Sequence, residues 1–290
     1  MLLLLAAVIW GAAFTAQSVG MEHLGPFSFN AIRFSIGGVV MLPVVAFRQR
    51  SLKKKAAGPE AGFTKRLVFT GVLCGLLLTL ANSIQQIGLL YTSPGKAGFI
   101  TALYVIIVPV IGLFFVNRPT LRLWISVVIA VAGMYLLCVT DTFSVEKGDI
   151  LIMICALIFA VHIMAIDRLA HDLDGITMSC IQFLTAGVIC SAIVPLTGEV
   201  ITLGAVKSAA IPLLYAGVFS CSFAYTFQTV GQQNTTPTAA SLLLSTESVF
   251  AAIAAWLLIG DTMTVREIFG GLLSFLAVIL SQLPSKKPTV

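Results

Sequence analysis

Apolar segments of about 18–25 residues follow one another along almost the whole chain, separated by short polar connections. A helix of about 20 residues spans the ~30 Å hydrocarbon core of a bilayer. Lipid offers no partner for exposed backbone groups, so such segments must be helices. Ten can be drawn, at about 1–19, 26–47, 67–91, 94–116, 121–140, 148–167, 175–196, 208–230, 237–259 and 265–283. We therefore predict an all-α membrane protein with ten transmembrane helices.

The composition agrees with this class. Of the 290 residues, 58% are hydrophobic and 10% are charged, whereas soluble domains carry about 25% charged residues. The net charge of +5 comes from short basic clusters between apolar segments, so no basic face is available to bind nucleic acid. The six cysteines lie inside apolar segments without metal-ligand spacing. We expect the lipid bilayer and a small-molecule substrate as partners, with no metal or cofactor; a homodimer is compatible with this pattern.

The orientation in the membrane follows from lysine and arginine, which are enriched in cytoplasmic loops. With the 48–66 loop in the cytoplasm, twelve such residues lie inside and four outside. The inner ones are Arg48, Arg50, Lys53, Lys54, Lys55, Lys65, Arg66, Arg118, Arg122, Arg168, Lys286 and Lys287, and the outer ones are Lys96, Lys147, Lys207 and Arg266. Both termini are then cytoplasmic. Lys96, beside the start of the fourth segment, is expected to be a solvated helix-end residue.

The chain repeats itself. At an offset of 143, residues 82–97 lie over 225–240 with five identities in sixteen, among them Gln85/Gln228 and Pro94/Pro237. At an offset of 149, residues 27–34 lie over 176–183. Each half holds five spans, an odd number, so the halves must be inverted relative to each other. Inverted repeats around a central cavity are the architecture of alternating access. We expect repeats at 1–141 and 148–283, followed by a cytoplasmic tail at 284–290.

Two prolines mark matched helix starts. Pro94 follows Ser93 and Pro237 follows Thr236. A serine or threonine is a preferred N-cap, and proline is favoured at the first helical position. The sequence therefore predicts that one helix begins at each proline.

Glu247 lies about ten residues into the apolar segment 237–259, which places its carboxyl group ~15 Å deep, near the bilayer midplane. An ionisable group there costs at least ~2.5 kcal/mol, so it faces a partner or a wet cavity. Glu247 is thus a candidate substrate-binding group or carrier of a coupling proton. In the structural alternative, it is a buried acid hydrogen-bonded to Ser245, Thr246 or Ser248.

Other polar and aromatic side chains fall inside the apolar segments, where they can compete with the hydration of a solute. Together with Glu247, the expected substrate-binding residues are Trp10, Phe14, Asn82, Gln85, Tyr104, His162, Tyr225 and Gln228. Aromatic rings with neutral amides and one carboxylate suit a small, neutral or zwitterionic, partly apolar solute. Each residue also has a structural alternative, in which the amides tie helices together and the rings only pack.

Two intramembrane groups have open roles. His162 either handles a proton, binds substrate or is a neutral packing residue. Arg33 lies about seven residues into the second segment. It either pairs with Glu247, receives a substrate carboxylate or extends its charged end outward to the interface.

Three motifs carry a family resemblance: Trp10-Gly11-Ala12-Ala13-Phe14, Asn30 with Arg33-Phe34, and Thr246–Phe250 running to Gly260-Asp261. Together they resemble the EamA family, the ten-span branch of the drug/metabolite transporter superfamily, over essentially the whole chain. That family commonly has Glu-Pro-Val and Gly-Glu in its ninth span. Ser248 and Asp261 stand at those positions here, so a proline kink is not implied. The resemblance implies export of amino acids, related metabolites or drugs across a bacterial inner membrane.

The preferred interpretation is a secondary transporter rather than an enzyme, with facilitated diffusion and proton coupling both compatible. The alternative is an intramembrane enzyme acting on a lipid-linked substrate. Catalysis would need a nucleophile–base pair or paired acids within the bilayer. Only one histidine and one carboxylate lie inside the spans, and neither GxSxG nor HExxH occurs. A channel would need rings of like groups or a filter sequence, and neither is visible.

Overall fold

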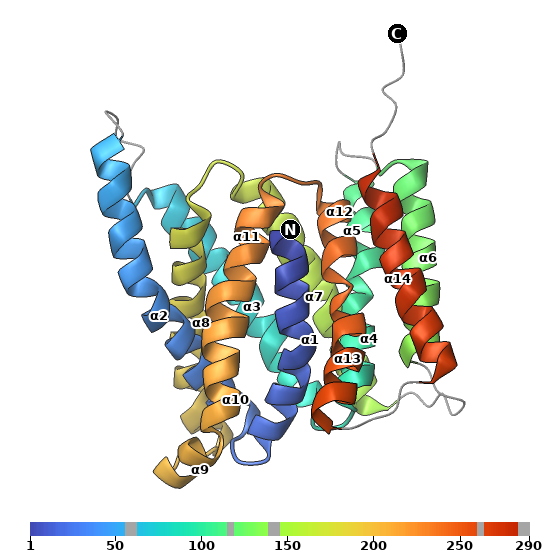
Figure 1. Cartoon of the computed structure of the whole chain (residues 1–290). Coiled ribbons are helices and arrows are strands. Elements are labelled where there is room, and N and C mark those ends of the chain that lie inside the picture. The colour runs from blue at the N-terminus through green and yellow to red at the C-terminus, as the bar shows by residue number, and fades with distance from the viewer. Residues whose placement is uncertain (56–62, 115–118, 139–145, 260–263, 284–290) are drawn as a thin grey trace.

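A computed structural model describes residues 1–55, 63–114, 119–138, 146–259 and 264–283, and all regular structure in these ranges is helical. The helices run side by side as one bundle (Figure 1). The helices of the first half of the chain are α1 (Leu2–Met21), α2 (Pro26–Lys55), α3 (Lys65–Gly88), α4 (Pro94–Ala102), α5 (Tyr104–Gly112) and α6 (Leu121–Cys138). Those of the second half are α7 (Lys147–Leu169), α8 (Gly175–Thr197), α9 (Leu203–Ser208), α10 (Ala210–Leu214), the π-helix η1 (Tyr215–Tyr225), α11 (Thr226–Gln232), α12 (Pro237–Leu244), α13 (Glu247–Ile259) and α14 (Val265–Gln282).

Nine helical segments among the described residues are long and apolar enough to cross a membrane. The predicted fifth segment, 121–140, appears as a shorter apolar helix at Leu121–Leu136 within α6. The end of this segment, the predicted tail at 284–290 and the motif end Gly260-Asp261 lie outside the described residues.

Packing against neighbours decides where each helix lies in the bundle. Helix α2 packs along α8 at one edge, and α6 packs along α14 at the opposite edge. Between these pairs, α3 contacts α7 and α8, while α1 contacts α13 and η1. The centre of the bundle is therefore walled by α1, α3, α7 and the segments that run beside them.

Both predicted proline starts are confirmed. Ser93 Oγ accepts a hydrogen bond from the backbone N–H of Lys96, and Pro94 opens α4. Thr236 Oγ1 likewise accepts from the N–H of Ala239, and Pro237 opens α12. Each cap satisfies a backbone donor that the first turn of a helix leaves free.

The fourth and ninth predicted segments are each broken near the middle. Helix α4 ends at Ala102 and α5 begins at Tyr104, while α12 ends at Leu244 and α13 begins at Glu247. The second break occurs although Ser248 stands where the family commonly has proline. Leu103 and Thr246, which lie in the two breaks, are 143 residues apart. The eighth segment is also irregular, because α10 continues into the π-helix η1 and then into α11. Breaks and π-helical turns at bilayer depth are typical of functional sites.

Candidate functional site: a central polar cavity

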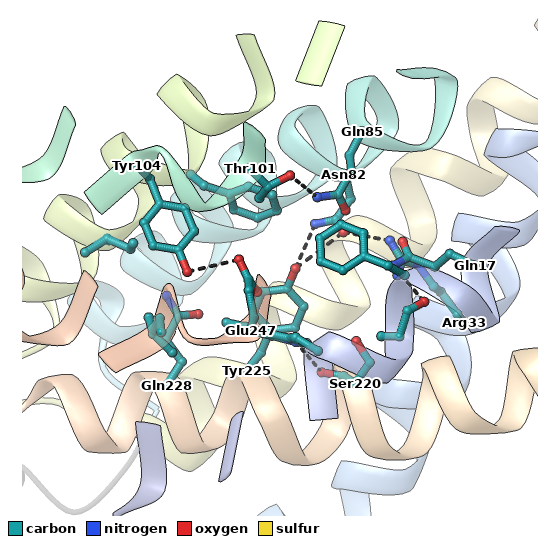
Figure 2. A pocket seen from close by; sticks show the side chains of 16 residues that line it. Gln17, Arg33, Asn82, Gln85, Thr101, Tyr104, Ser220, Tyr225, Gln228 and Glu247 are labelled. Carbon is teal, nitrogen blue, oxygen red and sulfur yellow. Dashed lines mark hydrogen bonds between the residues drawn. The ribbon is translucent and has the colours of Figure 1, made fainter. Parts of the chain in front are cut away.

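A small cavity lies where these irregular helices meet (Figure 2). Its centre has about 30 Å³ of free space, enough for about two water molecules. All of the described lining residues except Trp10 are buried. They are Trp10, Ala13, Phe14, Gln17, Arg33, Asn82, Gln85, Thr101, Tyr104, Phe159, Ile163, Ser220, Tyr225, Gln228, Leu244 and Glu247. The walls thus join polar groups and aromatic rings inside an otherwise apolar bundle.

Glu247 reaches the cavity because it is the first residue of α13. Its side chain is 3% exposed, and its Oε1 accepts a hydrogen bond of 3.0 Å from the hydroxyl of Tyr104, the first residue of α5. The alternative partners donate elsewhere. The hydroxyls of Ser245, Thr246 and Ser248 hydrogen-bond backbone carbonyl groups within their own helix turns. Glu247 is therefore held by one phenol, and its remaining acceptor positions can face the cavity.

Removing that phenol tests the pair directly. We expect Tyr104→Phe to weaken substrate binding about tenfold, because hydrogen bonds to charged groups contribute about 1.5–3 kcal/mol. Isothermal titration of purified protein with its substrate would measure the change. Thr101→Val is the matched control, because it also deletes a hydroxyl group from the cavity wall. That hydroxyl contacts Gln85 and not Glu247. Equal affinities for wild type and Tyr104→Phe would contradict a role for this hydrogen bond in positioning Glu247.

Arg33 supplies the cation of the cavity. It is 1% exposed, so its charged end does not extend to the interface. Its Nε donates to Asn30 Oδ1 over 2.8 Å, and one Nη donates to Asn82 Oδ1 over 2.6 Å. The guanidinium also lies over the ring of Phe34, 4.8 Å from its centroid. The ion pairs among the described residues include neither Arg33 nor Glu247.

Asn82 and Tyr225 lie between the two charged groups (Figure 2). Asn82 Nδ2 lies 3.1 Å from the Tyr225 hydroxyl, and Asn82 Oδ1 accepts from Arg33. The Trp10 ring packs on Tyr225 with centroids 4.6 Å apart, and Trp10 Nε1 donates to the carbonyl of Ser220 in η1. This network fixes the guanidinium and both rings without neutralising either charge.

The two predicted glutamines, Gln85 and Gln228, both line the cavity. Gln85 Nε2 donates to Thr101 Oγ1 over 3.2 Å. Gln228 is 2% exposed, and its Oε1 has no hydrogen-bond partner among the described residues. A buried amide oxygen without a partner is costly, so Gln228 is well placed to accept a hydrogen bond from a solute or a water molecule.

His162 is the predicted site residue that the cavity lining does not include. It is fully buried on α7, where its Nε2 lies 3.2 Å from Gln182 Oε1. Its ring meets that of Tyr225 edge-on, with centroids 6.4 Å apart. His162 therefore lies behind the wall that Tyr225 forms, and its predicted contact with substrate stays a prediction.

Several lining residues were absent from the predicted set: Ala13, Gln17, Thr101, Phe159, Ile163, Ser220 and Leu244. A signal for two of them existed in the internal offsets. Phe159 and Ile163 lie 149 residues after Trp10 and Phe14, which were both predicted. Apolar residues do not stand out in the sequence of an apolar helix, so only their positions relative to the predicted residues of the other half could have identified them.

The chain is similar to known transporters. The model of the EamA-like transporter family matches residues 1–139 and 146–283. An uncharacterized transporter of Archaeoglobus fulgidus is 31% identical over 97% of this chain and 84% of the relative. The uncharacterized transporter YwfM of Bacillus subtilis is 24% identical over 99% and 94% of the two chains. A crystal structure with 16% identity superposes with a TM-score of 0.75 over 96% of this chain and 98% of that one, which shows a shared fold. The chain is a multi-pass membrane protein and belongs to the EamA-like transporter family.

Proposed function

We propose that this protein is a secondary transporter that exports small amphiphilic solutes, amino acids or similar compounds, across a bacterial inner membrane by alternating access. One observation carries the proposal: a buried cavity holds one cation, Arg33, and one carboxyl group, Glu247, that form no ion pair with each other. Membership of a transporter family favours this activity over the intramembrane enzyme.

An α-amino acid complements this arrangement. Its carboxylate matches the planar donor fork of Arg33, and its ammonium group matches Glu247. Trp10, Phe14 and Phe159 supply apolar wall for a side chain. A solute with several phosphate groups would need more cations than the single arginine among the described lining residues. Glu247 and His162 are the groups proposed to carry a coupling proton.

The internal offsets support ten spans arranged as two inverted repeats. Twelve of the sixteen described lining residues form six pairs of equivalent positions. The pairs are Asn82/Tyr225, Gln85/Gln228, Thr101/Leu244 and Tyr104/Glu247 at an offset of 143, and Trp10/Phe159 and Phe14/Ile163 at 149. Tyr104–Glu247 and Asn82–Tyr225 are also hydrogen-bonded to each other. Equivalent residues can touch each other only near the axis that relates them, so a two-fold axis through the cavity would account for both contacts.

The size of the cavity supports a moving wall. Sites for small molecules usually enclose at least about 300 Å³, whereas about 30 Å³ is free here. The helices must therefore separate to admit a solute. Broken α4–α5 and α12–α13 and π-helical η1 are the elements whose backbone bonding is already interrupted at the cavity.

The proposed orientation places both termini in the cytoplasm. Arg48, Arg66 and Arg168 lie at the ends of α2, α3 and α7 that share one end of the bundle with the start of α1, at the top of Figure 1. Lys96 and Lys147 lie at the opposite end. The excess of cations at the first end supports a cytoplasmic location for it.

The test is counterflow in proteoliposomes that contain the purified wild-type protein. Labelled amino acids are screened first, and each one that is transported is then challenged with its des-amino acid and its decarboxylated amine. We expect the zwitterion to compete at least about tenfold better than either analogue, because each analogue lacks one charge-assisted contact of about 1.5–3 kcal/mol. Equal competition by all three compounds, or the absence of counterflow with every amino acid, would overturn the proposed substrate class.

A further inference from the structure

A partly buried ion pair lies at the end of the bundle where α3 leads into α4 and where α7 begins. Lys96 Nζ and Asp149 Oδ2 are 2.6 Å apart, and their side chains are 24% and 7% exposed. Asp149 also accepts hydrogen bonds from the Thr92 hydroxyl over 2.9 Å and from the backbone N–H of Glu146 over 2.8 Å. Lys96 is a helix-end residue as predicted, but the expectation that it is merely solvated is wrong, because Asp149, which is far away in sequence, pairs with it in the fold.

The two charges differ in how well they suit their own helices. Both residues occupy the third position of a helix, Lys96 in α4 and Asp149 in α7. The N-terminus of a helix favours an anion and disfavours a cation, by about 0.3–1 kcal/mol. Asp149 is thus favourable where it lies, and it completes a capping box with Glu146. Lys96 is unfavourable for α4, and the carboxylate of Asp149 offsets that cost.

The ion pair lies beside a tight contact between the end of α3 and the start of α7, because Asp149 directly follows Gly148. A Cβ atom added to Gly148 would lie 2.7 Å from the carbonyl oxygen of Gly88. Gln85 and Thr101, which line the cavity, lie within two turns of Gly88 and Lys96. This contact therefore lies between the cavity and one end of the bundle, the outer end in the proposed orientation, and we call it the outer closure.

The corresponding contact at the other end has a different chemistry. At the offset of 143, Gly88 corresponds to Gly231 and Lys96 to Ala239. Gly231 meets the side chain of Leu3 in α1, where an added Cβ would lie 3.0 Å from Leu3 Cγ. Alanine at the position of Lys96 cannot form an equivalent ion pair there. In both contacts a glycine packs against a neighbouring helix, but among the described residues an ion pair adjoins only the first contact.

We propose that Lys96 and Asp149 are a gating pair that keeps the outer closure shut and separates each time the cavity opens to that side. The proposal rests on the alternating access proposed above, and it identifies two further residues that act in the transport cycle. Opening separates the two charges, so the ion pair sets the ease of outward opening. Among the described residues, no ion pair joins α1 to α11 at the inner closure formed by Gly231 and Leu3.

Cysteine labelling tests the gating pair without requiring transport. Ser220→Cys places a thiol in the cavity wall, and the five described native cysteines are buried, so the wild type serves as the blank. Right-side-out and inside-out vesicles are treated with a membrane-impermeant cationic methanethiosulfonate. We expect Asp149→Asn to raise the labelling rate of the introduced thiol about tenfold from the side that carries Lys96, with no rise from the opposite side. Lys96→Gln should act in the same way and leaves the capping box of α7 intact.

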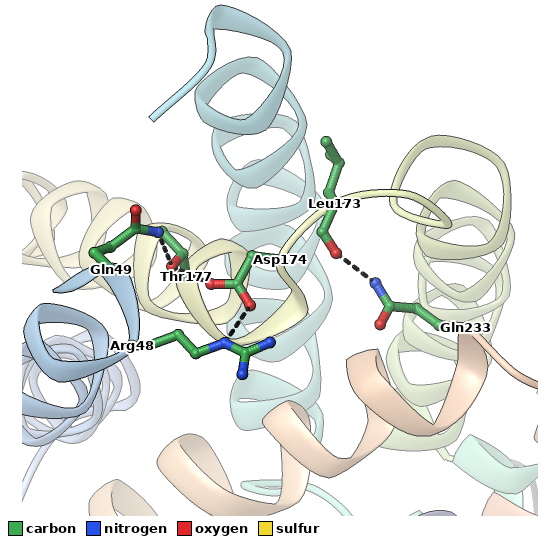
Figure 3. Close-up of polar contacts among 6 residues, drawn as sticks. All are labelled: Arg48, Gln49, Leu173, Asp174, Thr177 and Gln233. Atoms are coloured by element: carbon green, nitrogen blue, oxygen red, sulfur yellow. Dashed lines mark hydrogen bonds and ion pairs between the residues drawn. The ribbon is translucent and has the colours of Figure 1, made fainter. Parts of the chain in front are cut away.

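A matched control uses an ion pair at the inner end, shown in Figure 3. Asp174 lies 3.3 Å from Arg48 and joins α2 to α8, two helices that already pack along each other. We expect Asp174→Asn to leave the labelling rate unchanged. The double variant Lys96→Asp with Asp149→Lys exchanges the two charges. It should restore slow labelling, because the charges face each other again and each still occupies the third position of a helix. Wild-type labelling rates in both Asp149→Asn and Lys96→Gln would overturn the gating pair. A raised labelling rate in these two variants, combined with no amino-acid counterflow by the wild type, would support the gating pair and refute the proposed substrate class.

Discussion

Replacing Arg33 with glutamine is expected to lower the affinity for a zwitterionic substrate by about 30-fold or more. Removing one partner of a buried, hydrogen-bonded charge pair costs about 2–5 kcal/mol. Arg33 is the only cation among the described residues that line the cavity. The free protein should still fold, because Asn82 keeps its contact with the Tyr225 hydroxyl after Arg33 is removed. Isothermal titration would measure the affinity, and thermal unfolding in detergent would confirm that the variant is folded.

Two controls make this result specific. Arg33→Lys retains a charge but lacks the planar fork, so we expect it to bind more weakly than wild type and more tightly than Arg33→Gln. The decarboxylated amine has no group for Arg33 to bind, so its affinity should change little in Arg33→Gln. If a folded Arg33→Gln binds the zwitterion as wild type does, Arg33 is a structural residue and the carboxylate is received elsewhere.

Replacing Gly11 with leucine is expected to disrupt the bundle itself. Gly11 in α1 faces α13, and a Cβ atom there would lie 2.6 Å from Phe250 Cβ and 2.7 Å from the backbone nitrogen of Ala251. Backbone atoms cannot rotate away, so α1 must move off α13. Overpacking costs about 1–3 kcal/mol and occasionally more, which corresponds to a fall of about 3–10 °C or more in melting temperature at this size. Size-exclusion chromatography and thermal unfolding would show the loss.

Gly95→Leu is the matched substitution. Gly95 lies in the first turn of α4, and no atom lies within 4 Å of a Cβ added there. We expect its melting temperature to stay close to that of wild type. Equal stability of Gly11→Leu and Gly95→Leu would mean that α1 and α13 do not need the close contact that the structure shows.

The sequence was sufficient to predict features that depend on neighbouring residues or on the depth of one residue in the membrane. The starts of α4 and α12 could be predicted because the cap and the proline are adjacent in sequence. Glu247, Asn82 and Tyr104 could be placed near one cavity because polar groups at bilayer depth must face away from lipid. Their presence in the lining agrees with that reasoning, while their contact with a substrate stays a prediction.

Other features depend on residues that are distant in sequence. His162 fits the same polar pattern as Glu247, yet Gln182 holds it behind Tyr225. Glu199 accepts hydrogen bonds from the backbone N–H groups of Phe27 and Ser28 at the start of α2, 172 and 171 residues away. The π-helical winding of η1 has no local signal in a segment of small and aromatic residues. Such features arise only when the helices assemble.

With the inverted repeats proposed above, the hydrogen bond between Tyr104 and Glu247 has a consequence for how such a chain could arise. In a dimer of two identical five-helix proteins, a position on the symmetry axis faces its own copy, so a glutamate there would meet a second glutamate and repel it. Duplication followed by fusion removes that constraint, because each axial position can then mutate alone. A phenol can face a carboxyl group, as Tyr104 faces Glu247, and an amide can face a phenol, as Asn82 faces Tyr225. A single chain can thus place unlike, complementary groups where a symmetric ancestor could place only identical ones.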